Sequence, residues 1–250
     1  MAPPIVSIII PVFENLLGLK KSIDSIQQQD FKDYEVWILD GGSSLDTQNY
    51  LSNLEKPFYY QSRVDEGIYD AMNKGIQLAK GDWLYFLGSG DVFNTSTVLM
   101  SIFSIKKNIK NEIIAGKVRY EGIKNPFILN VTQKVKNVYW SPLMWVRNGL
   151  HHQGTFYKKT LFKNTAYNLS YKILADYHLN LNLYKNKAIC KIVDITVANC
   201  NSDGISKSGN WELYQEEIDF KTALTNPLLK PFFYLIAKIK YNLRKRTLNG

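Results

Sequence analysis

The stretch IVSIIIPVFEN, residues 5–15, decides the fold class. Its first six residues are all β-branched except Ser7, which is typical of a strand buried on both faces of a parallel sheet. Pro11 ends the strand. Apolar residues then recur at helical spacing from Leu16 to Ile26, so a helix is expected to follow.

The same alternation continues through the first hundred residues. Further buried strands are expected at 34–39, 58–61 and 83–87, each short, apolar and followed by a turn. Helices are expected around 51–54 and over 67–80. This alternation predicts an α/β fold, a Rossmann-like and mostly parallel open sheet flanked by helices.

Turns follow the strands at residues 11–15, 40–46, 62–66 and 88–91. In such sheets, ligands bind at the carboxyl ends of the strands. We therefore expect the turns to converge on one crevice. The first strand is followed neither by a phosphate loop ending in Gly-Lys-Ser/Thr nor by a GxGxxG turn, which argues against hydride transfer on a dinucleotide.

The second half is less regular. We expect a strand at 112–120, strand and loop over 121–150, a helix at 173–184 and one or two strands at 188–199. A polar loop at 201–210 precedes two helical stretches that close the chain.

Several carboxylates fall near strand ends. Asp91 comes directly after a buried strand, within small residues that let a charged ligand approach, so it is a candidate ligand for Mg²⁺ or Mn²⁺. Its alternative role is to cap a helix that starts near residue 94. Asp40, Asp65 and Asp70 lie at the same predicted edge, where isolated turn aspartates are commonly structural.

Four segments together resemble the inverting family 2 glycosyltransferases of bacterial polysaccharide, O-antigen and capsule synthesis. They are VSIIIPVFEN at 6–15, DGGS at 40–43, DEGIYDAMNKG at 65–75 and the stretch from Gly81-Asp82 to Asp91. Each motif alone is weak, but the four occur in order at compatible spacing over roughly residues 5–95.

The resemblance implies a GT-A fold, a nucleotide-diphosphate sugar donor and a divalent metal. It places Pro11, Phe13 and Glu14 in the nucleotide pocket, and Asp40 and Asp65 near the base and ribose. Asp91 matches the last aspartate of the family's Asp-Xaa-Asp metal motif. The predicted cofactor-binding residues are completed by Asp70, Ser89, Gly90 and His152.

Two positions depart from the family pattern. Gly41 stands where a second aspartate is common, which leaves the donor base open. Ser89 and Gly90 stand where a further acidic residue often occurs, so the diphosphate is expected to supply most of the metal ligands.

Asp176 lies in the segment ILADYH, residues 173–178, which resembles the short acidic motif that carries the family's catalytic base. An inverting transfer needs a carboxylate that takes the proton from the acceptor hydroxyl. The alternative for Asp176 is a carboxylate favoured at a helix start. His152 belongs to a His-Gln pair that similar proteins carry, and we expect it to line the active site or to be structural. The spacing of the histidines indicates no zinc site.

The bulk composition fits this interpretation. The chain has 250 residues, a net charge of +9 and two cysteines, which we expect to be buried thiols in a cytoplasmic protein. No signal peptide or membrane-spanning stretch is recognised. No nucleic-acid-binding module is recognised either, so the positive charge is not assigned to nucleic acid.

The C-terminal stretch 227–246 combines basic residues with an apolar helical face. We expect an amphipathic helix on an anionic membrane surface, at the inner face of the cytoplasmic membrane; the alternative is a helix packed on the domain. The basic residues are Lys230, Lys238, Lys240, Arg244, Lys245 and Arg246, and the apolar ones are Phe232, Leu235, Ile236, Ile239 and Leu243.

The sequence thus predicts an enzyme that transfers a sugar, with inversion, from a nucleotide-diphosphate sugar to a hydroxyl of a glycan acceptor, which we expect to be lipid-linked. Residues 1–110 would bind the donor, 111–210 would bind the acceptor and hold the base, and 211–250 would form the basic helices. The alternatives are a sugar nucleotidyltransferase, whose Arg-bearing glycine-rich loop is missing, and a non-catalytic sugar-nucleotide or glycan-binding protein.

Overall fold

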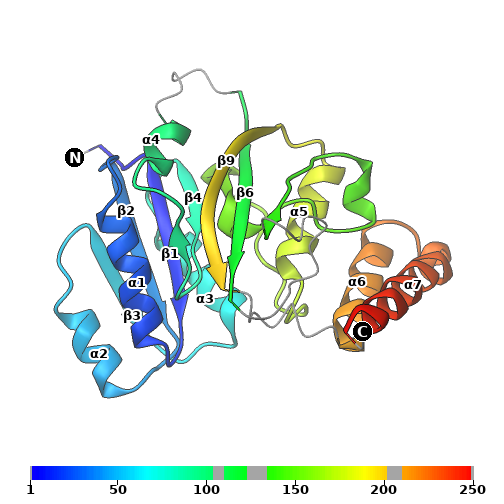
Figure 1. The fold of residues 1–250 in the computed structure, drawn as a ribbon, viewed down its shortest axis with the longest axis horizontal. Coiled ribbons are helices and arrows are strands. Elements are labelled where there is room, and N and C mark those ends of the chain that lie inside the picture. Colours follow the sequence, from blue (N-terminus) through cyan, green and yellow to red (C-terminus); the bar gives the residue numbers. More distant parts are fainter. Residues whose placement is uncertain (1, 104–109, 123–133, 202–209, 249–250) are drawn as a thin grey trace.

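The computed structural model describes residues 2–103, 110–122, 134–201 and 210–248, with side chains up to residue 245. Its described strands form one curled, mixed sheet of nine strands with helices on its faces (Figure 1). Most of the loop expected at 201–210, and part of the segment 121–150, lie outside the described residues. No described helix is long and apolar enough to cross a bilayer.

The first half of the sheet is parallel, as predicted. Strands β3, β2, β1 and β4 lie side by side in this order, with β1 in the middle and fully buried. Helices α1, α2 and α3 follow the first three strands. The bounds are β1 Val6–Val12, α1 Leu16–Gln27, β2 Tyr34–Asp40, α2 Leu45–Ser52, β3 Phe58–Ser62, α3 Ile68–Leu78 and β4 Trp83–Phe86.

The second half extends the same sheet with mixed pairing. β8 (Thr155–Lys158) pairs antiparallel with both β4 and β6 (Ile113–Glu121), and β6 pairs parallel with the long β9 (Cys190–Asn201). Both predicted strand regions, 112–120 and 188–199, are therefore confirmed. The short β5 (Val92–Phe93) returns to pair with β9, and β7 (Val135–Lys136) pairs with β6.

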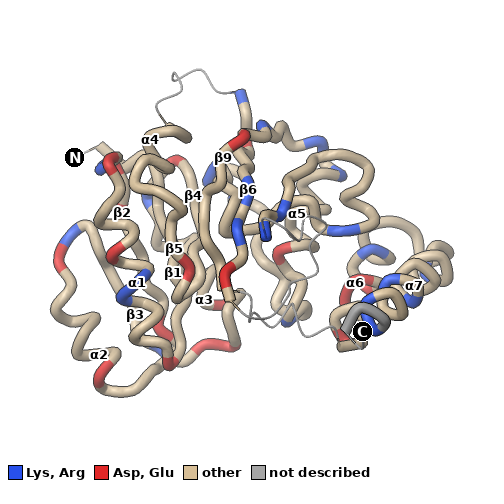
Figure 2. The backbone as a smooth tube through the Cα atoms, viewed as in Figure 1, with Lys and Arg blue, Asp and Glu red and all other residues tan. Residues whose placement is uncertain are grey.

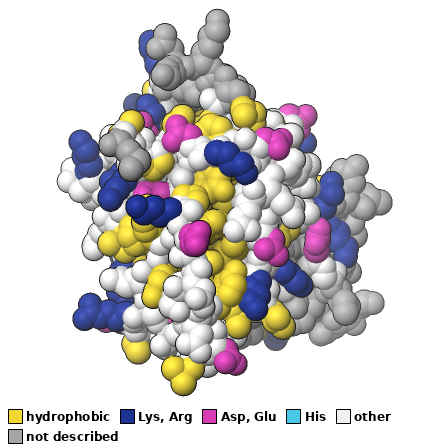
Figure 3. All heavy atoms as spheres, turned by 90° about the vertical axis from the view of Figure 1, so that its left-hand side faces the viewer, with side chains coloured by type: hydrophobic (Ala, Val, Ile, Leu, Met, Phe, Trp, Pro, Cys, Tyr) yellow, Lys and Arg dark blue, Asp and Glu magenta, His cyan; other side chains and the backbone are white. Residues whose placement is uncertain are grey.

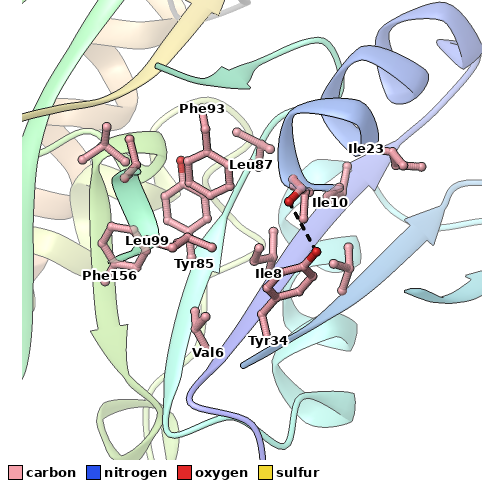
Figure 4. Packing of buried hydrophobic residues seen from close by; sticks show 14 of the residues in the cluster. Val6, Ile8, Ile10, Ile23, Tyr34, Tyr85, Leu87, Phe93, Leu99 and Phe156 are labelled. Carbon is pink, nitrogen blue, oxygen red and sulfur yellow. Dashed lines mark hydrogen bonds between the residues drawn. The ribbon is translucent and has the colours of Figure 1, made fainter. Parts of the chain in front are cut away.

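The core between α1 and the sheet is rich in aromatic side chains. The ring of Tyr85 stacks between Phe93 at 5.1 Å and Phe156 at 4.5 Å, which ties β4, β5 and β8 together (Figure 4). The hydroxyl of Tyr34 donates to the backbone oxygen of Ile26, so this buried polar group is satisfied. Packing of this kind fixes the strand ends from which the candidate site is built.

The C-terminal helices pack beside α5 (Ala175–Lys185) around a hydrophobic cluster of their own. α6 (Trp211–Leu224) and α7 (Lys230–Leu248) bury Phe220, Phe233 and Ala237 in a cluster that also holds Tyr177 of α5 (Figure 1). The expected closing helices are confirmed. Among the described residues the remaining helix is α4 (Val98–Phe103), and single 3-10 turns occur at Pro142–Trp145, His152–Gly154, Lys159–Phe162 and Pro227–Leu229.

Charge is distributed unevenly over these parts. Basic side chains gather along α7, next to acidic ones on α6 (Figure 2). On the face that includes the N-terminal edge of the sheet, basic and acidic side chains are instead intermixed with apolar ones (Figure 3). The positive net charge is thus most concentrated at the C-terminal end of the described chain.

Candidate active site

The turns after β1 and β2 are hydrogen-bonded to each other. The backbone N–H of Glu14 donates to Oγ of Ser43 (2.8 Å), and the N–H of Ser44 donates to Oε1 of Glu14 (2.9 Å). Glu14 has a φ of +48°, an uncommon conformation for a residue with a side chain. Phe13 beside it is 67% exposed, so its ring face is accessible to a ligand. Pro11, by contrast, is buried within β1.

Asp40 is buried and joins the turns after β2 and β3. It is 1% exposed, and its carboxylate accepts from Oγ of Ser43 and from Oγ of Ser62, both at 2.5 Å. These contacts hold both turns at the same edge of the sheet. In the structure Asp40 thus connects the ends of β2 and β3. Direct contact of Asp40 with a nucleotide stays a prediction.

Asp65 lies next to Phe13 across Gly41. A Cβ added at Gly41 would lie 2.9 Å from Oδ2 of Asp65 and 3.3 Å from Cδ2 of Phe13. The missing side chain at this position thus leaves room for the Asp65 carboxylate. Asp65 accepts from the N–H of Gly67 (2.9 Å).

Asp70 follows five residues later, in the first turn of α3. It accepts from Nζ of Lys74 (2.9 Å) and from the N–H of Glu66 (3.0 Å). The hydrogen bond from Lys74 is the main reason that the pKa of Asp70 lies below its usual value. Its contacts in the structure are those of a helix-start carboxylate, and donor binding by Asp70 stays a prediction.

The Ser89-Gly90 turn is braced against the start of α1. Nδ2 of Asn15 donates to the backbone oxygen of Ser89 (3.0 Å), and the N–H of Gly90 donates to Oγ of Ser22 (2.9 Å). Gly90 has a φ of +101°, which favours glycine. The turns after β1, β2, β3 and β4 therefore meet at one edge, as the sequence predicts.

Asp91 is buried beneath this turn. Its Oδ1 accepts from the N–H of Asn201 (2.9 Å) and its Oδ2 from Nε2 of Gln153 (2.7 Å). Burial raises the pKa of Asp91, although these hydrogen bonds act to lower it. Strand β5 follows directly and α4 begins only at Val98, so the alternative role of Asp91 as a helix cap is wrong.

The surroundings of Asp91 fit a divalent cation that is held mainly by a diphosphate. Oε1 of Gln153 is buried without a hydrogen-bond partner among the described residues, next to the amide nitrogen that Asp91 accepts from. Carboxylate and amide oxygens are ligands that Mg²⁺ and Mn²⁺ accept. The described residues contain no group of three or more His, Cys, Asp or Glu that could hold a metal ion by themselves.

Asp176 lies in the first turn of α5, and its carboxylate is close to side chains from three other segments. Its carboxylate lies 3.3 Å from the hydroxyl of Tyr69, 3.4 Å from Nδ2 of Asn148 and 3.5 Å from Nδ1 of His152. Burial acts to raise its pKa, but His152 and the positive charge of Lys136 outweigh this and lower it. Asp176 is thus ionised at neutral pH and able to accept a proton.

A cavity of about 390 Å³ opens beside Asp176. This lies at the lower end of the range for sites that hold one small molecule. Its polar residues include Lys136, Arg147, Asn148, His152 and Glu217. Its apolar walls are the rings of Tyr69, Tyr120, Tyr139, Tyr177 and Tyr214 with Val135, Ile173, Leu174, Leu213 and Leu243.

The turn His152–Gly154 connects the two parts of the site. Within it, His152 lies against Asp176 while its neighbour Gln153 donates to Asp91. Consecutive residues therefore contact the predicted base and the predicted metal ligand. The His-Gln pair therefore contacts both carboxylates from one short segment.

Sequence analysis did not identify several residues of the cavity. Lys136 and Arg147 carry no motif and line the cavity from a segment whose structure was poorly predicted. Tyr69 lies inside the recognised segment 65–75, directly before Asp70. This position was the only sequence signal that could have pointed to Tyr69. The participation of α6 and α7 depends on long-range packing, which local pattern does not reveal.

Relatives with a known name are glycosyltransferases. A PGL/p-HBAD biosynthesis glycosyltransferase of Mycobacterium bovis is 32% identical over 217 residues, covering 82% of this chain and 79% of the relative. A GalNAc(5)-diNAcBac-PP-undecaprenol β-1,3-glucosyltransferase of Campylobacter jejuni is 36% identical over 93 residues, 35% of this chain and 30% of the relative.

Solved structures with the same fold are GT-A glycosyltransferases. TarS of S. aureus in complex with UDP-GlcNAc has a TM-score of 0.66 at 15% identity, over 90% of this chain and 66% of that one. This chain thus spans about two thirds of the length of that TarS structure. A mannosyltransferase of Pyrobaculum calidifontis in complex with GDP-Man and Mn²⁺ also has a TM-score of 0.66 at 15% identity, over 97% and 71%.

The family assignment comes from the sequence itself. The sequence model of the family described as "Glycosyl transferase family 2" matches residues 7–172, which run from the first strand through the turn that holds His152. Together with the named relatives, this match decides for sugar transfer and against the nucleotidyltransferase and binding-protein alternatives. The chain belongs to glycosyl transferase family 2 and is a glycosyltransferase.

Proposed function

We propose that this glycosyltransferase moves a sugar from a nucleotide-diphosphate sugar to a hydroxyl of a lipid-linked glycan, with inversion, in the synthesis of a cell-surface polysaccharide. The observation that carries the proposal is the turn His152–Gly154, whose first two side chains contact Asp176 and Asp91. A predicted base and a predicted diphosphate-side carboxylate that contact one short segment suit a reaction that joins an acceptor hydroxyl to a donor.

The proposed reaction is a single displacement. Asp176 removes the proton of the acceptor hydroxyl while that oxygen attacks the anomeric carbon from the face opposite the diphosphate. The bond between the anomeric carbon and the diphosphate oxygen breaks, and its electron pair leaves with the nucleoside diphosphate. The contacts from Tyr69 and His152 orient the Asp176 carboxylate, and the lowered pKa keeps it ionised.

The donor would lie at the edge where the four turns meet. Phe13 presents an exposed ring to the base, and Asp65 lies beside it at the open position of Gly41. Asp91, Ser89 and the amide oxygen of Gln153 would hold a divalent cation together with the donor diphosphate. When bound, such a cation neutralises charge that builds on the leaving diphosphate.

In this proposal, residues 1–110 bind the donor and residues 111–210 bind the acceptor and contain the base. Residues 211–250 form the basic helices. The complexes of the two solved neighbours support a nucleotide-sugar donor, because their structures contain UDP-GlcNAc in one case and GDP-Man with Mn²⁺ in the other. The Campylobacter relative is named for an undecaprenol-diphosphate glycan, which supports a lipid-linked acceptor.

The C-terminal helix supports a place on an anionic membrane surface. Phe232, Leu235 and Ile239 of α7 are each more than half exposed and fall on one helical face, while Phe233 and Ala237 pack on α6. An apolar stripe with basic neighbours suits the interface of an anionic bilayer. Co-sedimentation with vesicles of phosphatidylglycerol, and its loss on Phe232→Ser plus Leu235→Ser, would support this location; equal binding by the variant would refute it.

The transfer itself is tested with a panel of nucleotide sugars and lipid-diphosphate-linked acceptors. Wild type is expected to release nucleoside diphosphate and form a product whose new anomeric bond, read by NMR coupling, is inverted relative to the donor. Asp176→Asn keeps the shape of the side chain and is expected to lower turnover by roughly 10²- to 10⁴-fold. A product with retained configuration, or full activity of Asp176→Asn, would refute the mechanism.

A further inference from the structure

The C-terminal helices form part of the cavity that contains Asp176. Leu213, Tyr214 and Glu217 of α6 line it, and so do Lys240, Leu243 and Arg244 of α7. Figure 1 shows the two helices packed together beside α5, the helix of Asp176. A segment that the sequence indicates as a membrane helix therefore also closes the side of the site where an acceptor would lie.

Positive charge exceeds negative charge in this cavity. Its cationic side chains are Lys136, Arg147, Lys240 and Arg244, and its carboxylates are Asp176 and Glu217. The Glu217 carboxylate is already engaged, because Nζ of Lys240 lies 2.6 Å from it and Nζ of Lys221 lies 2.5 Å from it.

Lys136 and Arg147 also line the cavity, from β7 and from the residues after the 3-10 turn Pro142–Trp145. Nζ of Lys136 lies 3.4 Å from the backbone oxygen of Leu150, and the guanidinium of Arg147 lies 5.2 Å from the ring centre of Tyr139. Among the described residues, neither group forms an ion pair with a carboxylate within 4.0 Å. Both are therefore available to an anion in the cavity.

The exposed stripe of α7 leads toward the same place. Phe232, Leu235 and Ile239 are followed on that face by Leu243, which lines the cavity. A ligand with an apolar chain and an anionic head would match this order, with the chain along α7 and the head among the cations. The small volume of the cavity limits how far the anion lies from the hydroxyl that Asp176 deprotonates.

We propose that this cavity recognises an acceptor with a lipid-linked phosphate or diphosphate within one or two sugar units of the accepting hydroxyl, and that Lys136 and Arg147 bind that phosphate. The inference rests on the proposed function and narrows its acceptor to a short, early intermediate. It gives α7 two roles, as a surface for the lipid and as a wall of the acceptor site.

The test uses geranyl diphosphate as the probe. Geraniol, which has the same chain without the diphosphate, and decanoate, an apolar chain with a carboxylate, are the controls. Calorimetry is expected to show that geranyl diphosphate binds at least about tenfold tighter than either control. Lys136→Met and Arg147→Met are each expected to weaken its binding about tenfold. Lys21→Met, an exposed change on α1 outside the cavity, is expected to leave it unchanged.

Several outcomes would overturn the inference. They are equal binding of geranyl diphosphate and geraniol, equal binding of decanoate, and a loss in Lys21→Met as large as in the cavity variants. The comparison of the three probes uses wild type alone and so does not depend on folding of any variant.

The same preparations are titrated with UDP and GDP in the presence of Mn²⁺. Nucleotide binding without selective binding of geranyl diphosphate would refute this inference and leave the proposed function standing. Absence of nucleotide binding in wild type would instead count against the proposed function.

Discussion

Replacement of Glu217 by glutamine is expected to lower the free energy of unfolding by about 3–5 kcal/mol, the usual cost of breaking a buried ion pair by removing one partner. Glu217 is 3% exposed, and its carboxylate lies 2.5 Å from Nζ of Lys221 and 2.6 Å from Nζ of Lys240. Lys221 is itself only 2% exposed. The variant therefore leaves a buried ammonium group without its counter-charge.

The pH dependence follows from Lys221. Burial lowers its pKa to about 8, although Glu217 acts to raise it. Because the folded pKa lies below the unfolded value of 10.5, the charged form costs stability fully below about pH 8, and the cost disappears as the pH rises toward 10.5. The destabilisation by Glu217→Gln should accordingly be larger at pH 7 than at pH 10.

Urea denaturation followed by circular dichroism measures this loss, from the midpoint and the slope of the transition. Asp219→Asn is the matched control on the same helix. Its contact with Lys230 is 3.4 Å long and both side chains are about half exposed, so less than about 1 kcal/mol is expected. If Glu217→Gln cost no more than Asp219→Asn, the buried charge cluster would not stabilise the wall of the cavity as argued.

Four further outcomes are expected. Asp176→Asn should lower kcat by roughly 10²- to 10⁴-fold at unchanged nucleotide affinity, measured by single-turnover transfer; a fall in affinity alone would contradict the role as base. His152→Asn should move the acidic limb of the pH–kcat profile to higher pH, because burial then raises the pKa of Asp176 with less opposition from His152; an unmoved limb would contradict this. Burial lowers the pKa of Lys136 to about 8, so affinity for geranyl diphosphate should fall as the pH rises through 8, and Lys136→Met should show no such step in calorimetry. Gly75→Ala should cost about 1–3 kcal/mol in urea denaturation, since its Cβ would lie 2.5 Å from Cγ2 of Ile9; unchanged stability would show that α3 shifts freely.

The meeting of the four turns was predictable because its geometry is local. Each of the four turns directly follows a buried strand, and parallel strands bring their carboxyl ends to one edge. Contacts such as those of Asp40 with Ser43 and Ser62 then follow from the register of β2 and β3. The resemblance to a family supplied Asp176, which no spacing argument connects to Asp91.

The surroundings of Asp176 were not predictable in the same way. β8 pairs antiparallel between β4 and β6, and this pairing carries His152 and Gln153 to the carboxylates. Nothing in the local sequence fixes such a long-range pairing. The role of α7 was missed for a related reason, since its exposed stripe is visible in the sequence but its packing on α6 is not.

The most direct test of the account is a calorimetric titration with UDP, GDP, dTDP and CMP, with and without Mn²⁺, on wild type, Asp91→Asn and Asp176→Asn. The account predicts that one nucleoside diphosphate binds wild type and Asp176→Asn in an Mn²⁺-dependent way, and that Asp91→Asn loses this dependence. Binding by none of the nucleotides, or the same Mn²⁺-dependent binding by Asp91→Asn, would contradict the donor site described here.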